Sequence, residues 1–317
     1  MSEPGPKQDF RYPLHWRLMD GVERLADIVW PRSMARHTGW LFIAPALLLV
    51  GLLVLGLVQI ADSSLRVLDT ATFLPSEDWS LTNYEKALGT KVYLTVAWRS
   101  VSAAALTTVL TLILAFAYAY ALVRVRKAWI RKALLITLFL PFFIGQVVRA
   151  YGWLIILGNS GMVNEALGLI GVAPMRLLFN YGAVIFGLVQ YMLPFAVLLL
   201  VPALTAIPEE TETAAGSLGA SWPRIFWHVL LPMAKPGLIG AGLVVFTLTL
   251  TDFAVPAMLG GGSQDFIANA IYDQFFRTAD QGLGAALALM LVAAGSILVG
   301  LVFMVFGAGT LAMGGRK

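Results

Sequence analysis

The sequence predicts an all-α membrane protein with six membrane-spanning helices. Hydrophobic residues make up 59% of the 317 residues and charged residues 13%, and the mean hydropathy is +0.80. Soluble domains of this size do not need so much apolar sequence, so this composition is typical of a polytopic membrane protein. Polar loops separate six apolar segments, each long enough at ~1.5 Å per residue to cross a ~30 Å hydrocarbon core as a helix.

The predicted spans divide the chain into three parts. An N-terminal segment occupies residues 1–38, a six-helix membrane domain residues 39–312 and a short tail residues 313–317. The spans are expected at residues 40–60, 100–123, 133–157, 177–207, 237–258 and 283–312. Pro141 is expected to interrupt the third span, because proline breaks the helical hydrogen-bond ladder.

The N-terminal segment is polar and basic, with apolar residues at helical spacing inside it. Those on one helical face are Leu14, Leu18, Val22, Leu25 and Val29. This pattern is typical of an amphipathic helix that lies on a membrane surface, and a disordered tail is the alternative.

The distribution of Lys and Arg predicts the face of the membrane on which each loop lies. Six spans place both termini on one face, together with the turn 124–132 and the loop 208–236. That face carries fifteen Lys and Arg residues, whereas the loops 62–91, 158–176 and 260–281 carry five. Because basic residues concentrate on the cytoplasmic side, both termini and the 208–236 loop are expected in the cytoplasm.

Several kinds of active site are excluded by the sequence. The chain has no cysteine, and its histidines, His15, His37 and His228, lack the spacing of metal ligands. Neither a Gly-x-x-x-x-Gly-Lys phosphate loop nor a Gly-x-Ser-x-Gly elbow is present. We therefore expect no catalytic residue, metal or cofactor in this chain, and an ATP-driven machine would need a partner subunit.

The loop at residues 208–236 is polar and lies between two long apolar segments. Pro208 and the glutamates after it are typical of a first helical turn, and Gly219 is expected to close that helix in a left-handed conformation. Ser221 would cap a second helix that stops at Pro232. Apolar residues recur at spacings of three and four: Leu218, Trp222, Phe226 and Val229. One face of the loop is therefore expected to dock against a partner.

This loop resembles the EAA loop of ATP-binding-cassette importer permeases, which reads Glu-Ala-Ala, three residues, Gly, nine residues and Ile-x-Leu-Pro. The matching positions are Ala214, Ala215, Gly219, Val229, Leu231 and Pro232. Thr213 stands where the family has the glutamate, and Glu212 lies one residue earlier. The resemblance implies a coupling helix that fits a cleft of the ATPase, with these residues and Trp222 at the contact. Three alternatives stay open: Glu212 replaces the motif glutamate through a shifted register, Thr213 makes the contact itself, or a partner permease carries the dominant dock.

Two ionisable residues lie at membrane depth, Arg149 in the third span and Asp252 in the fifth. A charge there costs ~2.5 to 3.5 kcal/mol on insertion scales unless it faces water or a partner. Either the two residues form a structural pair, or Asp252 lines a path for a cation. Aromatic residues nearby can stack on an organic cation or fill space between helices: Tyr151, Trp153, Tyr191 and Phe253.

The chain also resembles spermidine/putrescine-type permeases over about residues 40 to 308. The most specific pieces are Arg149-x-Tyr151-x-Trp153 after Leu140-Pro141, and Asp252-Phe253 followed by Pro256. The resemblance implies a type I ABC importer permease fold in a bacterial inner membrane. It also implies a second permease subunit, two copies of an ATPase that binds ATP and Mg, and a periplasmic binding protein.

The sequence therefore favours a permease subunit that imports a small solute, with a polyamine as the expected substrate. Related members carry aminophosphonates, iron chelates, sulfate or amino-acid derivatives, and these substrates stay open. A secondary transporter or channel that works alone would show inverted repeats and a cluster of intramembrane charges. A membrane scaffold would not need the bent cytoplasmic loop. Membrane lipid surrounds the chain in each case, and no nucleic-acid partner is expected.

Overall fold

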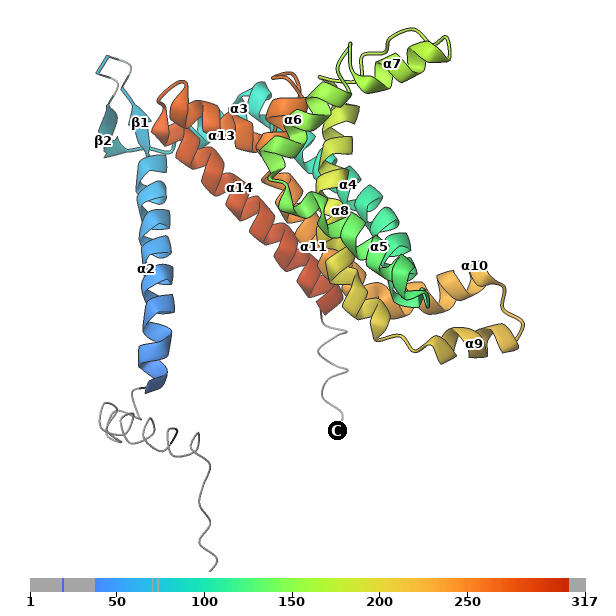
Figure 1. Cartoon of the computed structure of the whole chain (residues 1–317). Helices are drawn as coiled ribbons and strands as arrows, with labels where there is room; N and C mark the ends of the chain where they lie inside the picture. Colours follow the sequence, from blue (N-terminus) through green and yellow to red (C-terminus); the bar gives the residue numbers. More distant parts are fainter. Residues whose placement is uncertain (1–18, 20–37, 70, 73, 308–317) are drawn as a thin grey trace, which may run out of the picture. The chain divides into compact units, whose positions relative to one another are not determined.

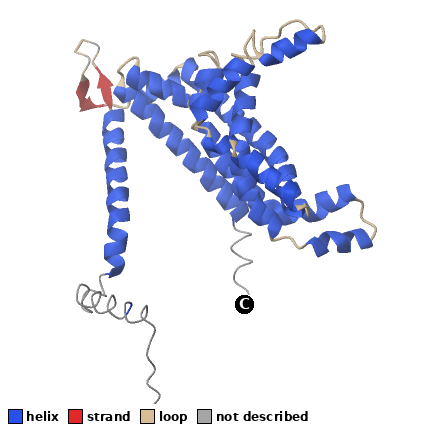
Figure 2. Ribbon diagram, viewed as in Figure 1, coloured by secondary structure: helices blue, strands red, loops and turns tan. Residues whose placement is uncertain are grey.

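The computed structural model describes residues 19, 38–69, 71, 72 and 74–307 (Figure 1). The predicted all-α class is confirmed, with a two-stranded antiparallel sheet as an addition within these residues (Figure 2). The chain divides into two units, residues 1–59 and residues 60–317. The N-terminal helix predicted inside residues 1–38 and the tail at residues 313–317 lie outside the described residues, apart from residues 19 and 38.

Five helical segments of the described chain are long and apolar enough to cross a membrane. They are α2 (Thr38–Ser64), α4 (Lys91–Arg124), α8 (Tyr181–Thr205), the run of α10 (Trp222–Ile225), η2 (Phe226–Leu230) and α11 (Leu231–Leu250), and α14 (Gln281–Val302) with η3 (Phe303–Gly307). A bent pair, α5 (Ala128–Phe139) and α6 (Gln146–Ile156), supplies a sixth span when it is counted as one. By length and composition, this count agrees with the six predicted spans.

The third span bends by 100° between α5 and α6. Pro141 begins the short 3-10 turn η1 (Pro141–Phe143), since it has no N–H with which to continue the α-helical ladder. Arg149 donates hydrogen bonds to the carbonyls of Pro141 and Ile144, so a side chain supplies donors inside the break. The predicted interruption of the third span at Pro141 is confirmed, and the break redirects the chain.

The fifth span differs from its prediction at both ends. It begins at Trp222 and not at residue 237, because Pro232 does not stop the helix. The π-helical turn η2 ends two residues before Pro232 and shifts the hydrogen-bond register, which accommodates a residue without an N–H. The helix ends at Leu250, so the span predicted to reach residue 258 is interrupted there. Asp252 therefore lies in the break before α12 (Ala254–Leu259) and not inside a helix.

Small residues let α4 pack closely against α8 and α11 in the second unit (Figure 1). The buried face of α4 carries Ala103, Ala104, Thr107, Thr111, Ala115 and Ala119. Small side chains at spacings of three and four allow helices to approach where lipid offers no hydrophobic driving force. A Cβ on Gly237 of α11 would lie only 2.3 Å from the Cβ of Ala203 in α8. These three helices build the main apolar core of this unit.

Shorter elements connect the spans. They are β1 (Arg66–Leu68), β2 (Pro75–Trp79), α3 (Thr82–Gly89), α7 (Met162–Leu169), α9 (Glu209–Ser217) and α13 (Ile267–Phe276). Asn83 of α3 donates hydrogen bonds to the carbonyls of Ser64 and Arg66, both at 2.9 Å, and so fixes α3 against the hairpin. The first turn of α14 comes close to the same carbonyl, because a Cβ on Gly282 would lie 2.0 Å from the Arg66 oxygen.

Gly282→Ala is therefore expected to lower the stability of the protein by about 1–3 kcal/mol, as overpacked sites do. The measurement is the thermal unfolding midpoint of the detergent-solubilised protein. Gly300→Ala, in the same helix with nothing within 4 Å of an added Cβ, is the control and should unfold at or slightly above the wild-type temperature. Equal midpoints for the two variants would contradict the close approach of α14 to the hairpin.

Candidate functional site

The candidate site lies where the two interrupted spans meet, with α6 packed against α12. Asp252 occupies the break between α11 and α12 and is only 7% exposed. Its Oδ1 accepts a hydrogen bond from the Val255 N–H at 2.9 Å, which caps the first turn of α12. Its Oδ2 accepts a hydrogen bond from Nε2 of Gln146 in α6. A single carboxylate thus joins the ends of two broken spans.

Neighbouring residues explain why the chain breaks here. Asn269 of α13 donates to the Phe253 carbonyl at 3.0 Å and accepts from the Phe266 N–H at 2.9 Å. Pro256 lies in the first turn of α12, where a missing N–H leaves no helical hydrogen bond unmade. Two backbone groups at the break are therefore satisfied by side chains, the Val255 N–H by Asp252 and the Phe253 carbonyl by Asn269 of α13.

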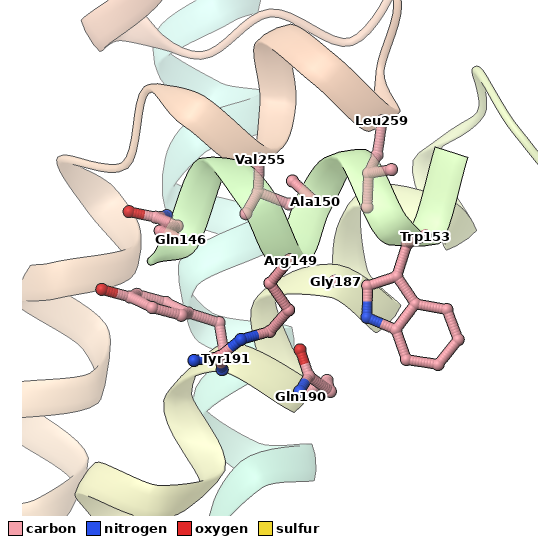
Figure 3. A pocket seen from close by; sticks show the side chains of 9 residues that line it. All are labelled: Gln146, Arg149, Ala150, Trp153, Gly187, Gln190, Tyr191, Val255 and Leu259. Atoms are coloured by element: carbon pink, nitrogen blue, oxygen red, sulfur yellow. The ribbon is translucent and has the colours of Figure 1, made fainter. Parts of the chain in front are cut away.

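Arg149 extends from α6 toward Tyr191 of α8 (Figure 3). Its guanidinium carbon lies 5.3 Å from the centre of the Tyr191 ring, which is a cation–π distance. Nη2 donates to the Pro141 and Ile144 carbonyls, while Nε and Nη1 are buried without a hydrogen-bond partner among the described residues. No ion pair joins Arg149 to Asp252 in the described structure. The alternative in which the two charges form a structural pair is therefore wrong for this conformation.

A cavity of about 10 Å³ lies between α6, α8 and α12 (Figure 3). Its lining consists of Gln146, Arg149, Ala150, Trp153, Gly187, Gln190, Tyr191, Val255 and Leu259. A volume of this size holds at most about one water molecule, so the cavity has no room for a solute in this conformation. Asp252 is not in the lining, and both of its oxygens are occupied by Val255 and Gln146.

The structure brings some of the residues predicted for a translocation path together and separates others. Arg149, Trp153 and Tyr191 line the cavity. Tyr151 is 60% exposed and lies outside the lining. Phe253 packs instead on Tyr272, with 4.8 Å between the two ring centres. The aromatic residues therefore serve partly as packing, as one of the two alternatives expects.

Three amide residues of this region are not singled out by the sequence patterns: Gln146, Gln190 and Asn269. The sequence feature that could have pointed to them is an amide side chain inside an apolar segment. An amide there must find hydrogen-bond partners, because an unpaired polar group is costly to bury. Two of the three, Gln146 and Asn269, bind the break that contains Asp252.

The loop at residues 208–236 forms two helices around a glycine bend, as predicted. α9 ends at Ser217, and Gly219 has a left-handed φ of +81°. The Ser221 side chain makes no capping hydrogen bond, which corrects the predicted cap. Thr213 and Ala214 are exposed, and Leu218 is 89% exposed. One side of this loop is therefore open to a partner.

Glu212 points toward α4 and not away from the chain. Its Oε1 accepts a hydrogen bond from Nε of Arg124 at 2.7 Å, and its Oε2 accepts one from the Tyr120 hydroxyl at 2.7 Å. The hydroxyl of Thr213 donates within its own helix to the Glu209 carbonyl at 3.1 Å. A shifted register that presents Glu212 in place of the motif glutamate is therefore not present in this conformation.

Interrupted spans that meet at a buried charge are typical of membrane transport proteins. Residues 107–308 match the family of binding-protein-dependent transport system inner membrane components. This match covers more than half of the chain and includes the break at Asp252 and the 208–236 loop. The protein therefore belongs to this family.

Individual relatives agree with this family. The spermidine/putrescine transport system permease protein PotB of Escherichia coli strain K12 is 32% identical over 251 residues, which cover 78% of this chain and 89% of the relative. The protein of the same description from Salmonella typhimurium strain SL1344 is 31% identical over 251 residues, which cover 78% of this chain and 85% of the relative. A bacterial ABC transporter that imports the acidic polysaccharide alginate has a chain of similar fold, with a TM-score of 0.65 at 17% identity and coverage of 91% of this chain and 98% of that chain.

Gln146→Leu is expected to lower the free energy of unfolding by about 1–3 kcal/mol, because it leaves a buried oxygen of Asp252 without its donor. The thermal midpoint of the purified protein measures the loss. Gln190→Leu is the matched control, since Gln190 lines the same cavity but makes no hydrogen bond within the described residues. Equal losses in the two variants would show that the bond between Gln146 and Asp252 does not stabilise the site.

Proposed function

We propose that the chain is the permease subunit of an ATP-driven importer of polyamines such as spermidine and putrescine. The observation that carries this proposal is the identity of 31% and 32% to two spermidine/putrescine permeases over 78% of the chain. The carboxylate of Asp252 would bind an ammonium group of a polyamine once Gln146 releases one of its oxygens, since both oxygens accept hydrogen bonds in this conformation.

The importer would need three kinds of partner. This chain has no phosphate-binding loop, so a dimer of ATPase subunits would bind ATP and Mg. A periplasmic binding protein would deliver the substrate, in keeping with the description of the family as binding-protein-dependent. A second permease subunit would complete the path. A solved alginate transporter of similar fold is recorded in complex with its own alginate-bound periplasmic protein.

The loop at residues 208–236 would dock the ATPase on the cytoplasmic side. Fifteen Lys and Arg residues lie in this loop, the turn 124–132 and the two termini, which supports a cytoplasmic position for all four. The exposed residues Thr213, Ala214 and Leu218 would face the cleft of the ATPase. Closure of the ATPase dimer would then move the loop and, through it, the membrane helices.

Transport would require the closed site to open. The cavity has no room for a polyamine, and Gln146 holds α6 to the break at Asp252. Movement of α6 away from α12 would free one oxygen of Asp252 and widen the cavity. Arg149, tied to backbone carbonyls on the other side, would repel ammonium groups and so favour their approach to Asp252.

Spermidine uptake tests this function. Cells without their own polyamine uptake would express the chain with its ATPase, second permease and binding-protein partners, and take up labelled spermidine. Asp252→Asn should keep the protein in the membrane and lower uptake at least about tenfold, since a hydrogen bond to a charged group contributes ~1.5–3 kcal/mol. Uptake of sulfate or an aminophosphonate in place of spermidine would keep the importer class and overturn the polyamine substrate.

Gly219→Pro is expected to release the ATPase from the complex, because proline fixes φ near −65° and this position has a φ of +81°. Trp222→Asp should act similarly by placing a charge in the stack with Phe226, whose ring centre lies 5.7 Å away. The amount of ATPase that co-purifies with the tagged permease measures both effects. Gly240→Ala in α11, outside the loop and with nothing within 4 Å of an added Cβ, should retain the ATPase. If the wild-type amount of ATPase co-purified with Gly219→Pro, the loop would not be the docking element.

A further inference from the structure

A partly buried cluster fastens the first helix of the loop to α4. Arg124 and Glu212 form an ion pair whose side chains are 17% and 14% exposed. Tyr120 donates its hydroxyl proton to the second oxygen of Glu212, and Nη2 of Arg124 also donates to the Ile207 carbonyl at 2.9 Å. Arg124 therefore binds both α9 and the connection that leads into it from α8.

Aromatic rings fasten the second helix of the loop to the same part of α4. The Tyr120 ring meets Trp222 edge to face at 6.5 Å, and Phe116 meets Phe226 edge to face at 5.3 Å. Phe116, Tyr120 and Arg124 are spaced by four residues, so they lie on one face of α4. Both arms of the loop are thus attached to the last turns of one helix.

The opposite end of α4 is attached to the segment between α12 and α13. Arg99 donates to the carbonyls of Ser263 and Asp265 at 3.1 and 3.3 Å. The Ser100 hydroxyl accepts a hydrogen bond from the N–H of Ile267 at 2.8 Å. α4 has 34 residues and is about 50 Å long at ~1.5 Å per residue. One unbroken helix therefore connects the cytoplasmic loop to the chain that follows α12, the helix capped by Asp252.

We infer that Arg124 and Glu212 are positioning residues that lock the coupling loop to α4, so that movement of the loop is passed along α4 to the segment at residues 260–267. Glu212 acts inside the chain and is not a contact to the ATPase. The inference rests on the proposed function in taking the loop as the ATPase dock. It does not depend on the identity of the substrate.

The lock adds a polar attachment for α9, which otherwise meets the spans through two short non-helical connections and the packing of Ala215 on the core. Residues 206–208 lead into α9, and the turn at Gly219 leads out of it. Without the ion pair, α9 can rotate about these two connections, and part of any push on it is lost. A second ion pair, Arg126 with Glu209 at 3.0 Å, is 85% and 54% exposed, and exposed pairs contribute little. It therefore provides a matched control at the same junction.

Distance measurements between spin labels test the lock without any substrate. The natural chain has no cysteine, so Ser217→Cys in α9 and Val109→Cys in α4 give two unique labelling sites on the full-length protein in lipid nanodiscs. The labelled parent should show one narrow distance peak. Glu212→Gln and Arg124→Gln should lose that peak to a broad distribution, and Tyr120→Phe should broaden it less. Arg126→Gln and Glu209→Gln should keep it.

ATP hydrolysis by the complete complex tests whether the lock carries coupling. Glu212→Gln should assemble with the ATPase at wild-type yield and keep its basal hydrolysis, while stimulation by spermidine-loaded binding protein falls about tenfold, within the usual range of allosteric coupling. Arg126→Gln should retain full stimulation.

Loss of ATPase from the Glu212→Gln complex would overturn the inference, because Glu212 would then contact the ATPase directly. A narrow label distance in Glu212→Gln would also overturn the inference. An equal loss of stimulated hydrolysis in Arg126→Gln would do the same. A wild-type complex that ignores spermidine would overturn the proposed substrate, while the label distances would still decide the lock.

Discussion

The fold depends on the requirement that backbone N–H and C=O groups inside a membrane find hydrogen-bond partners within the protein. Continuous helices such as α4 and α8 meet it by themselves. The two broken spans meet it with side chains, through Arg149 at the first break and Asp252 with Asn269 at the second. Because Gln146 joins the two breaks, a change in one alters the hydrogen bonding of the other. The two charged side chains at these breaks thus complete the hydrogen bonding of the backbone.

The positions of the spans could be predicted because composition decides which segments lie in lipid. Their ends could not, because tertiary contacts decide how far a helix continues beyond the membrane. α4 begins at Lys91, nine residues before its predicted start at residue 100, since polar residues do not end a helix whose first turns are held by other segments. Arg99 and Ser100 make such contacts with residues 263–267, far away in the sequence.

The candidate site could be predicted in part. Arg149 and Asp252 stand out in the sequence because charges are rare in apolar segments. Their partners do not stand out in the sequence, because each partner depends on how a break redirects the chain. Pro141 predicts an interruption but not a bend of 100°. Pro232 is predicted to stop a helix, and the helix continues through it. A π-helical turn absorbs it, and nothing in the residue types between Phe226 and Leu230 reveals that turn.

The inward orientation of Glu212 also determines what the outer side of α9 presents. Beyond the glutamates of its first turn, the exposed residues Thr213, Ala214, Gly216 and Ser217 carry no charge. A complementary cleft would then recognise this surface by shape and by contact with small side chains, and it would need no basic residue to match. Such a cleft would therefore keep its fit to α9 when its own surface charge changes.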